Sequence, residues 1–180
     1  MIQASNTIRI LTPADADAAA RLHRLSLEEA WSAPDWARYS AEASVVALGS
    51  VTEDSGLAGV LLIRIVAGEA ELLTIAVHAA QRGRGIGSRL LTAGLADART
   101  RGAECVHLEV AADNSAALRL YQRAGFRQCG CRPEYYRRAG GRIDATLMRL
   151  TIGNPEAGGS NPGRSESEPP DPVSIRTKKH

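Results

Sequence analysis

The sequence predicts a single mixed α+β domain followed by a polar C-terminal tail. Strand and helix periodicities alternate over residues 7–151 in the order β-α-α-β-β-β-α-β-α-β-β, which differs from the regular βαβ alternation of a parallel sheet. A chain of 180 residues with 44% hydrophobic and 23% charged residues suits one domain with a sizeable core. Beyond residue 152 the chain is rich in Gly, Pro and Ser and has only three apolar residues. We therefore expect a domain over 1–152 and a disordered tail over 153–180.

Two helices and four strands are expected in the first half of the domain. A strand at 7–11 precedes an amphipathic helix at 14–30, and a shorter helix follows at 34–43. The next three apolar segments are expected to be strands, the first two of them forming a hairpin: 44–50, 57–66 and 71–78.

The second half of the domain is expected to add two helices and three strands. In chain order these are a helix, a strand, a helix and two closing strands: 86–101, 104–110, 115–124, 126–131 and 142–151. Gly125 follows the second of these helices and can adopt the left-handed conformation that ends a helix.

Composition excludes several classes of function. The formal net charge of +2 is too small to favour nucleic acid or a membrane surface as a partner. No apolar run reaches the roughly 18 residues that span a bilayer, and the N-terminus lacks a signal-peptide pattern, so we expect a cytoplasmic protein. The three cysteines are too few for a disulfide framework. Cys129 and Cys131 lack a second ligand pair, and Cys105, His107 and Glu109 are only a conceivable set, so no metal site is predicted.

A glycine-rich segment between a predicted strand and a predicted helix is the strongest local pattern: Gln81-Arg82-Gly83-Arg84-Gly85-Ile86-Gly87-Ser88. Alternate glycines let the backbone approach an anion closely, and the helix that follows presents unpaired N–H groups and the positive end of its dipole. This arrangement suits a pyrophosphate. It lacks the lysine of a nucleotide P-loop, and Ser88 stands where a dinucleotide fingerprint has its last glycine. A glycine-rich turn without a ligand is the alternative.

Further segments flank this loop in a recognisable order: Leu72–His78 before it, Leu108–Ala117 and Leu120–Phe126 after it. With the Gln-x-x-Gly-x-Gly spacing they resemble the GNAT acyltransferase superfamily across residues 7–151. Pro133–Tyr136 and Gly141–Ala145 are similar to its branch of ribosomal-protein alanine N-acetyltransferases. The resemblance implies a GNAT-type domain: a mostly antiparallel sheet with helices on both faces and a parallel strand pair that splays apart. It also implies direct transfer, in a ternary complex, from acetyl-CoA to the N-terminal α-amine of a small-subunit ribosomal protein.

The resemblance places the cofactor on the splayed strand and the glycine loop. Backbone groups of Ile75, Ala76 and Val77 would bind the pantetheine arm as a pseudo-strand. The loop residues would hold the pyrophosphate: Arg82, Gly83, Arg84, Gly85, Ile86, Gly87 and Ser88. Asn114 would contact the cofactor near its thioester, and it is equally suited to cap the helix that follows.

Glu109 is the candidate general base. Strand alternation puts it on the face opposite Val106, Leu108 and Val110. An α-ammonium group, with a pKa of about 7.7–8.0, must lose a proton before it attacks a thioester, and a carboxylate facing a cleft can accept that proton. An exposed strand glutamate held in a salt bridge is the alternative.

Five aromatic residues complete the candidate site. By the resemblance, Tyr121 would protonate the departing CoA thiolate, although a tyrosine at this position could also belong to the core. Tyr135 and Tyr136 are expected in a loop over the acceptor groove. Trp31 and Trp36 are expected on its opposite wall, and both aromatic pairs could equally be packing residues.

Two other functions stay open. The acceptor could be a small-molecule amine or a lysine, although a polyamine site should show acidic residues clustered beyond Glu109. The chain could also be a non-catalytic acyl-CoA-binding module, which would need neither Glu109 nor Tyr121.

Overall fold

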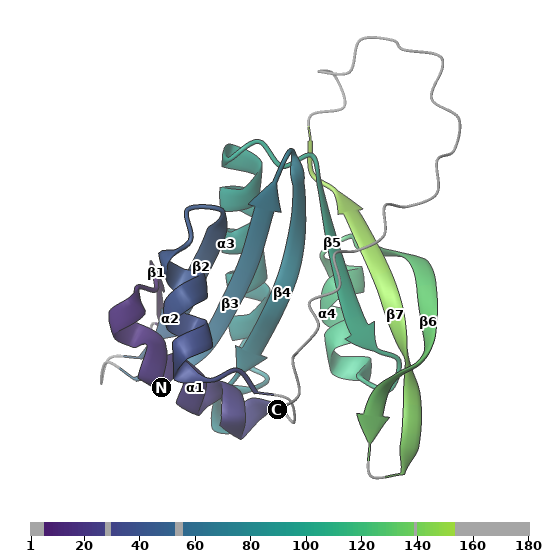
Figure 1. The fold of residues 1–180 in the computed structure, drawn as a ribbon, viewed down its shortest axis with the longest axis horizontal. Helices are drawn as coiled ribbons and strands as arrows, with labels where there is room; N and C mark the ends of the chain where they lie inside the picture. Colours follow the sequence, from purple (N-terminus) through teal and green to yellow (C-terminus); the bar gives the residue numbers. More distant parts are fainter. Residues whose placement is uncertain (1–5, 28–29, 53–55, 139, 154–180) are drawn as a thin grey trace.

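A computed structural model describes residues 6–27, 30–52, 56–138 and 140–153 (Figure 1). Its elements in chain order are β1 (Thr7–Ile10), η1 (Pro13–Asp15), α1 (Ala16–Ser26), α2 (Ala33–Ala41), β2 (Val45–Val51), β3 (Leu57–Val66), β4 (Glu69–Val77), η2 (Ala79–Gln81), α3 (Ile86–Thr100), β5 (Cys105–Ala111), α4 (Ser115–Arg123), β6 (Arg127–Arg138) and β7 (Gly141–Thr151). The seven strands form one sheet in the order β1-β2-β3-β4-β5-β7-β6. Neighbours are antiparallel except β4 and β5, so the predicted fold class is confirmed.

Helices cover both faces of the sheet, as predicted (Figure 1). On one face α1 and α2 bury Leu22 and Trp36 against Leu62 of β3. On the other face α3 and α4 cover a second core that includes Leu90 and Val106. Alternate residues of the central strands thus enter different cores, because successive side chains of a strand point to opposite faces.

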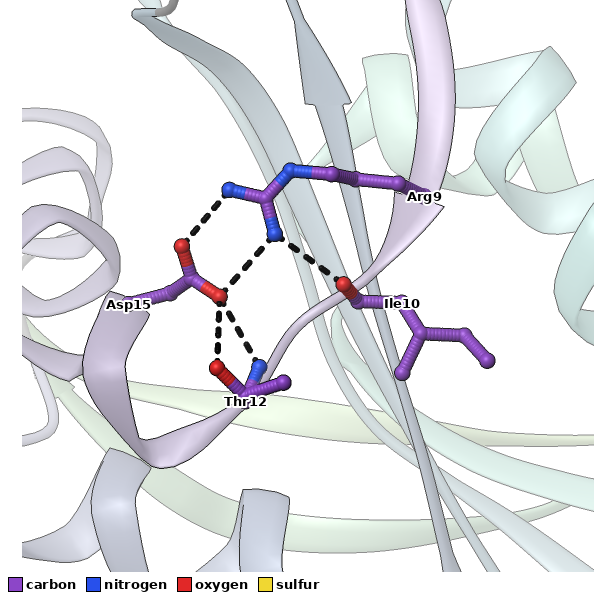
Figure 2. Close-up of polar contacts among 4 residues, drawn as sticks. All are labelled: Arg9, Ile10, Thr12 and Asp15. Atoms are coloured by element: carbon purple, nitrogen blue, oxygen red, sulfur yellow. Dashed lines mark hydrogen bonds and ion pairs between the residues drawn. The ribbon is translucent and has the colours of Figure 1, made fainter.

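Polar contacts at the end of β1 fix the start of α1 (Figure 2). The Arg9 guanidinium forms two hydrogen bonds to the Asp15 carboxylate, at 2.6 and 3.0 Å. The same carboxylate accepts from the N–H and the hydroxyl of Thr12, at 2.9 and 3.2 Å. Hydrogen bonding to Arg9, followed by that to Thr12, holds the pKa of Asp15 well below its usual range. These bonds set the direction in which α1 leaves the sheet.

The parallel strands β4 and β5 separate after a short paired stretch. They are in register only at Glu69 with Cys105, Ala70 with Val106 and Glu71 with His107. Figure 1 shows them side by side at this end and apart at the other. The register between β3 and β4 shifts next to the point of separation and leaves Leu73 as the extra residue of a β-bulge. A bulge bends its strand, which helps to carry β4 away from β5.

The first helix is shorter than predicted. A helix was expected over 14–30, whereas η1 and α1 together end at Ser26. Leu27 is extended, with φ −136° and ψ 147°, although its N–H still bonds to the His23 carbonyl at 2.9 Å. Residues 28–29 lie outside the described part of the chain. The chain turns here because the next described segment returns to the His23 ring, which accepts the Trp31 N–H at 2.9 Å.

Strand β6 is longer than predicted. A strand was expected over 126–131 with a loop after it, but β6 continues to Arg138 and pairs Tyr136 with Ile143 of β7. Tyr135 and Tyr136 therefore lie on a strand rather than on a loop. An irregular stretch between Arg132 and Tyr136 interrupts the pairing and includes Glu134, which has φ +52° and donates its N–H to Asp144 at 2.9 Å.

The predicted tail lies almost wholly outside the described residues. Gly153 is the last described residue, and its N–H and that of Ile152 both bond to the Glu104 carbonyl. The expected disorder of 153–180 stays a prediction. In the part of the chain that is described, no helix has the length and apolar character needed to cross a bilayer.

Candidate active site

A cavity of about 230 Å³ lies where β4 and β5 separate. Six predicted site residues line it: Trp31, Ile75, Glu109, Asn114, Tyr121 and Tyr136. Its wall also includes residues of α1 and the segment after it, of β4 and of β6: His23, Leu27, Leu72, Leu73, Thr74 and Arg138. The fold thus brings together side chains from both ends of the domain.

Glu109 lines this cavity and also forms an ion pair. Its Oε1 lies 3.0 Å from Nε of Arg132, and its side chain is 24% exposed. The predicted strand alternation is correct, because Val106 and Val110 are buried in the core beneath α3 and α4. The two interpretations of Glu109 are therefore compatible: a carboxylate positioned by an arginine can still face the cavity and accept a proton.

Tyr121 of α4 is buried and reaches the cavity wall. Its ring packs against Phe126 at a centroid distance of 5.8 Å. Burial, followed by the charge on Tyr136, raises the pKa of the Tyr121 phenol well above its usual range. The hydroxyl therefore stays protonated at neutral pH and can donate a proton or a hydrogen bond into the cavity.

His23 is the most important cavity residue that sequence reasoning missed. It is 1% exposed, and burial lowers the pKa of its ring to about 4. Because Nδ1 accepts the Trp31 N–H, the proton of the neutral ring is on Nε2. Nε2 then donates to Oγ1 of Thr74 at 2.8 Å, which leaves the Thr74 hydroxyl able to donate in turn. Its two partners lie 8 and 51 residues away, so no local pattern marks this histidine.

The aromatic residues divide into wall and core. Trp31 lines the cavity and stacks on Tyr39 with ring centroids 4.8 Å apart, whereas Trp36 is 1% exposed and belongs to the core. Tyr136 lines the cavity, and Tyr135 is 50% exposed and does not. Each predicted pair therefore contributes one cavity residue.

The backbone of β4 can pair with an extended ligand on the side that β5 has left. The His78 N–H donates to the Ala58 carbonyl of the opposite residue at 2.9 Å. Hydrogen-bonded pairs alternate along an antiparallel ladder, so Ala76 is bonded to β3 while the peptide groups of Ile75 and Val77 face the gap. The Val77 carbonyl already accepts from Arg82 Nε and Ser26 Oγ, at 3.2 and 3.4 Å, which leaves the Val77 N–H for a ligand. Of the three predicted pantetheine contacts, the geometry favours Ile75 and Val77. Ala76 is instead committed to the sheet.

The glycine loop connects the end of β4 to α3. Gly83 and Gly85 have φ +77° and +74°, and a Cβ added to either would meet nothing within 4 Å. Gly85 is the N-cap of α3, and its carbonyl accepts the first helical bond, from the Arg89 N–H at 3.0 Å. The N–H groups of Ile86, Gly87 and Ser88 therefore precede any intrahelical partner and are available to an anion. The loop lies outside the cavity wall, at the end of the strand that leads from it.

Arg82 has a structural role in the loop. Its guanidinium donates to the carbonyls of Val77 and Ser26, at 3.2 and 3.3 Å. The arginine thereby joins the ends of β4 and α1, so less of its hydrogen-bonding capacity is left for a phosphate. Arg84 is exposed.

Asn114 is a helix cap that also faces the cavity, and its expected contact with the cofactor stays a prediction. Its Oδ1 accepts the Ala117 N–H at 3.1 Å, which makes it the N-cap of α4. It also lines the cavity beside Tyr121. The cap fixes the first turn of the helix that carries Tyr121.

Comparisons with known proteins agree with this geometry. Residues 14–126 match the model of the acetyltransferase (GNAT) family. The chain is 34% identical over 147 residues to the ribosomal protein bS18-alanine N-acetyltransferase of Salmonella typhimurium, with 82% of this chain and 98% of that protein covered. It is 40% identical over 147 residues to an uncharacterised protein of Mycobacterium leprae, covering 79% of this chain but only 40% of that protein. The solved ribosomal-protein-S18-alanine N-acetyltransferase of Escherichia coli superposes with a TM-score of 0.78 at 30% identity, covering 83% of this chain and 96% of the other.

Proposed function

The chain belongs to the GNAT acetyltransferase family and uses acetyl-CoA as acetyl donor, and from this premise we propose that it acetylates the α-amine of a protein N-terminus. The observation that carries the proposal is the meeting of Glu109 and Tyr121 in one cavity beside the open edge of β4. A carboxylate and a protonated phenol supply the two proton transfers that acetyl transfer to an amine requires.

The two residues divide the proton transfers between them. Glu109, directly or through water, removes a proton from the α-ammonium group of the acceptor. The amine nitrogen then attacks the thioester carbonyl carbon. The nitrogen of the tetrahedral intermediate gives up its second proton to solvent, and the carbon–sulfur bond breaks as the intermediate collapses. Tyr121, which is protonated before this step, donates its phenolic proton to the sulfur as the thiolate departs.

The rest of the site binds acetyl-CoA. In this proposal the peptide groups of Ile75 and Val77 hold the pantetheine arm in extended form. The loop from Arg82 to Ser88 holds the pyrophosphate at the N-terminus of α3. Asn114 lies near the thioester.

Direct transfer fits the placement of the cysteines. Cys105 is buried and Cys129 and Cys131 are exposed, and none of them lines the cavity. This placement supports transfer in a ternary complex without an acyl-enzyme.

The acceptor enters between α1 and β6 in this proposal. Trp31 and Leu27 form the apolar wall on one side, and Tyr136 lies on the other. These apolar and aromatic side chains suit an uncharged first side chain of the acceptor. Together with the relatives named for ribosomal-protein alanine acetylation, this favours the N-terminal alanine of a small-subunit ribosomal protein in the cytoplasm.

Product analysis by mass spectrometry tests the acceptor. Purified protein and acetyl-CoA are incubated with three versions of the ribosomal N-terminal peptide, which begin in Ala, Ser or Trp. A fourth incubation contains an N-blocked peptide with a lysine. We expect one acetyl group on the free α-amine rather than on lysine, because an α-amine loses its proton near pH 8 and a lysine near 10.4. Among the three free peptides, the one that begins in Ala should react fastest. Acetylation of the blocked lysine peptide alone would contradict the proposal, and acetyl-CoA binding without any peptide product would favour a small-molecule acceptor or a non-catalytic module.

A further inference from the structure

A second cluster of reactive side chains lies outside the cavity, at the paired end of β4 and β5. Glu69, Cys105 and His107 each offer one potential ligand atom, and these atoms all lie within 4.8 Å of one another. Sγ of Cys105 is 3.4 Å from Nε2 of His107. None of the three residues lines the cavity. We propose that this cluster binds a divalent transition metal ion such as Zn²⁺ through a thiolate, an imidazole and a carboxylate.

The backbone brings these side chains together without strain. Cys105 and His107 are two residues apart on β5, so their side chains share one face of the sheet. Glu69 of β4 is the register partner of Cys105 in the parallel pair. By strand alternation Glu109 also shares this face of β5. Its carboxylate is instead ion-paired with Arg132 of β6, and β6 lies on the side of β5 away from β4.

The distances suit tetrahedral zinc. With Zn–S of about 2.3 Å and Zn–N of about 2.0–2.1 Å, the sulfur and nitrogen ligands of a tetrahedral site lie about 3.6 Å apart. The observed separation of 3.4 Å is within about 0.2 Å of that value. Glu69 is exposed, so its carboxylate can complete the third position by a side-chain rotation. The fourth position would be taken by water.

The surrounding charges are compatible with this ion. One thiolate and one carboxylate balance the charge of a divalent cation. The nearest other acidic residue on β4, Glu71, is occupied by Arg64 at 2.6 Å. Arg149 is the cross-strand partner of His107 on β7 and is exposed, so its charge is screened by solvent.

The donor set also selects the metal. Thiolate and imidazole ligands favour zinc and cobalt, whereas Mg²⁺ and Ca²⁺ prefer sites made of oxygen ligands. The ion would join β4 to β5 at the last positions where they pair, immediately before they separate to form the cavity. Binding to the folded chain alone would therefore raise the temperature of unfolding.

Calorimetric titration of the full chain with Zn²⁺ tests this site, with Co²⁺ as a spectroscopic probe. We expect one ion per chain, a thiolate-to-cobalt charge-transfer band, a higher unfolding temperature with zinc, and none of these effects with Mg²⁺. Glu69→Gln and His107→Gln each remove one ligand and should weaken zinc binding by more than the roughly 10–100-fold that loss of an outer partner costs. Glu69 is exposed, so its substitution tests the site without disturbing the core.

Cys131→Ser is the matched control. The Cys131 thiol also lies beside a carboxylate, with Sγ 3.8 Å from Oδ2 of Asp144. Among the described residues, however, Cys131 belongs to no group of three potential metal ligands. Zinc affinity should be unchanged in this variant. The proposal is overturned if the protein binds no zinc, if cobalt gives no thiolate band, or if Glu69→Gln and His107→Gln bind zinc as tightly as the unchanged chain.

Discussion

The buried ring of His23 ties three parts of the chain together. It accepts the Trp31 N–H, donates to Thr74 of β4 and contacts the Trp36 ring at a centroid distance of 5.5 Å. The bond from the Trp31 N–H requires the neutral ring, because a second ring proton would remove the acceptor at Nδ1. The histidine therefore positions one wall of the cavity only while it is uncharged.

Stability should consequently fall in acid through His23. The pKa of its ring is lowered to about 4 in the folded chain, from about 6.5 when unfolded. Between these values the unfolded chain binds more protons than the folded chain. The contribution of His23 to the free energy of unfolding is therefore fully present above pH 6.5 and decreases as the pH falls toward 4. The loss amounts to about 3 kcal/mol, at about 1.4 kcal/mol per pKa unit.

Urea unfolding between pH 7.5 and 4.5 measures this loss. His23→Gln should be less stable at neutral pH and should show a smaller decrease across the range, whereas His78→Gln, outside both cores, should keep the full decrease. An equal decrease in the unchanged chain and in His23→Gln would show that His23 is not the titrating group.

The glycine loop and the first turn of α3 act as one unit. Gly85 supplies the left-handed residue from which the helix starts, and the next three N–H groups point away from the helix without partners inside it. No side chain is needed for an anion to bind there. The prediction of a phosphate site thus depends on backbone conformation, which alternate glycines indicate in the sequence.

Gly102 provides a matched control for Gly85. Both have positive φ, +85° and +74°, and a Cβ at either position meets nothing within 4 Å, but Gly102 lies at the opposite end of α3. Changing either to Ala should lower the free energy of unfolding by roughly 1–2 kcal/mol, because each forces an alanine into the left-handed region. Only Gly85→Ala should weaken acetyl-CoA binding, by about tenfold, since its methyl group would enter the space proposed for the phosphates. Calorimetry with acetyl-CoA measures this; equal affinities of the two variants would remove the loop from the cofactor site.

Element types were predictable from local periodicity, whereas their irregularities were not. The order of strands and helices follows from the two hydrophobic periods, and both faces of β5 follow from simple alternation. The bulge at Leu73 and the positive φ of Glu134 depend on pairing with distant strands. The sequence offered no local signal for either feature.

The cavity depends on the whole molecule, because its walls come from residues between His23 and Arg138. The residues that the sequence did identify belong to segments with a recognisable motif, such as Glu109 and Tyr121. His23 lies outside these segments and becomes a neighbour of Thr74 only when α1 packs on the sheet. The acceptor side of the site was therefore the less predictable part.

Glu109 should accept the proton that the α-ammonium group of the acceptor loses, although it also resembles an ordinary ion-paired glutamate. Glu71 is such a glutamate: it is paired with Arg64 at 2.6 Å on a neighbouring strand and does not line the cavity. The two residues therefore separate a catalytic role from loss of a strand ion pair.

The most direct measurement is the turnover of a free α-amine peptide by Glu109→Gln and Glu71→Gln, with acetyl-CoA affinity measured for each. We predict that Glu109→Gln lowers kcat by about 10²–10⁴-fold at neutral pH, the usual range for a general base, while acetyl-CoA affinity stays unchanged. Glu71→Gln should keep kcat close to that of the unchanged chain. Undiminished turnover by Glu109→Gln, or a parallel loss of acetyl-CoA binding, would contradict the assignment of this cavity as the place where amine and thioester react.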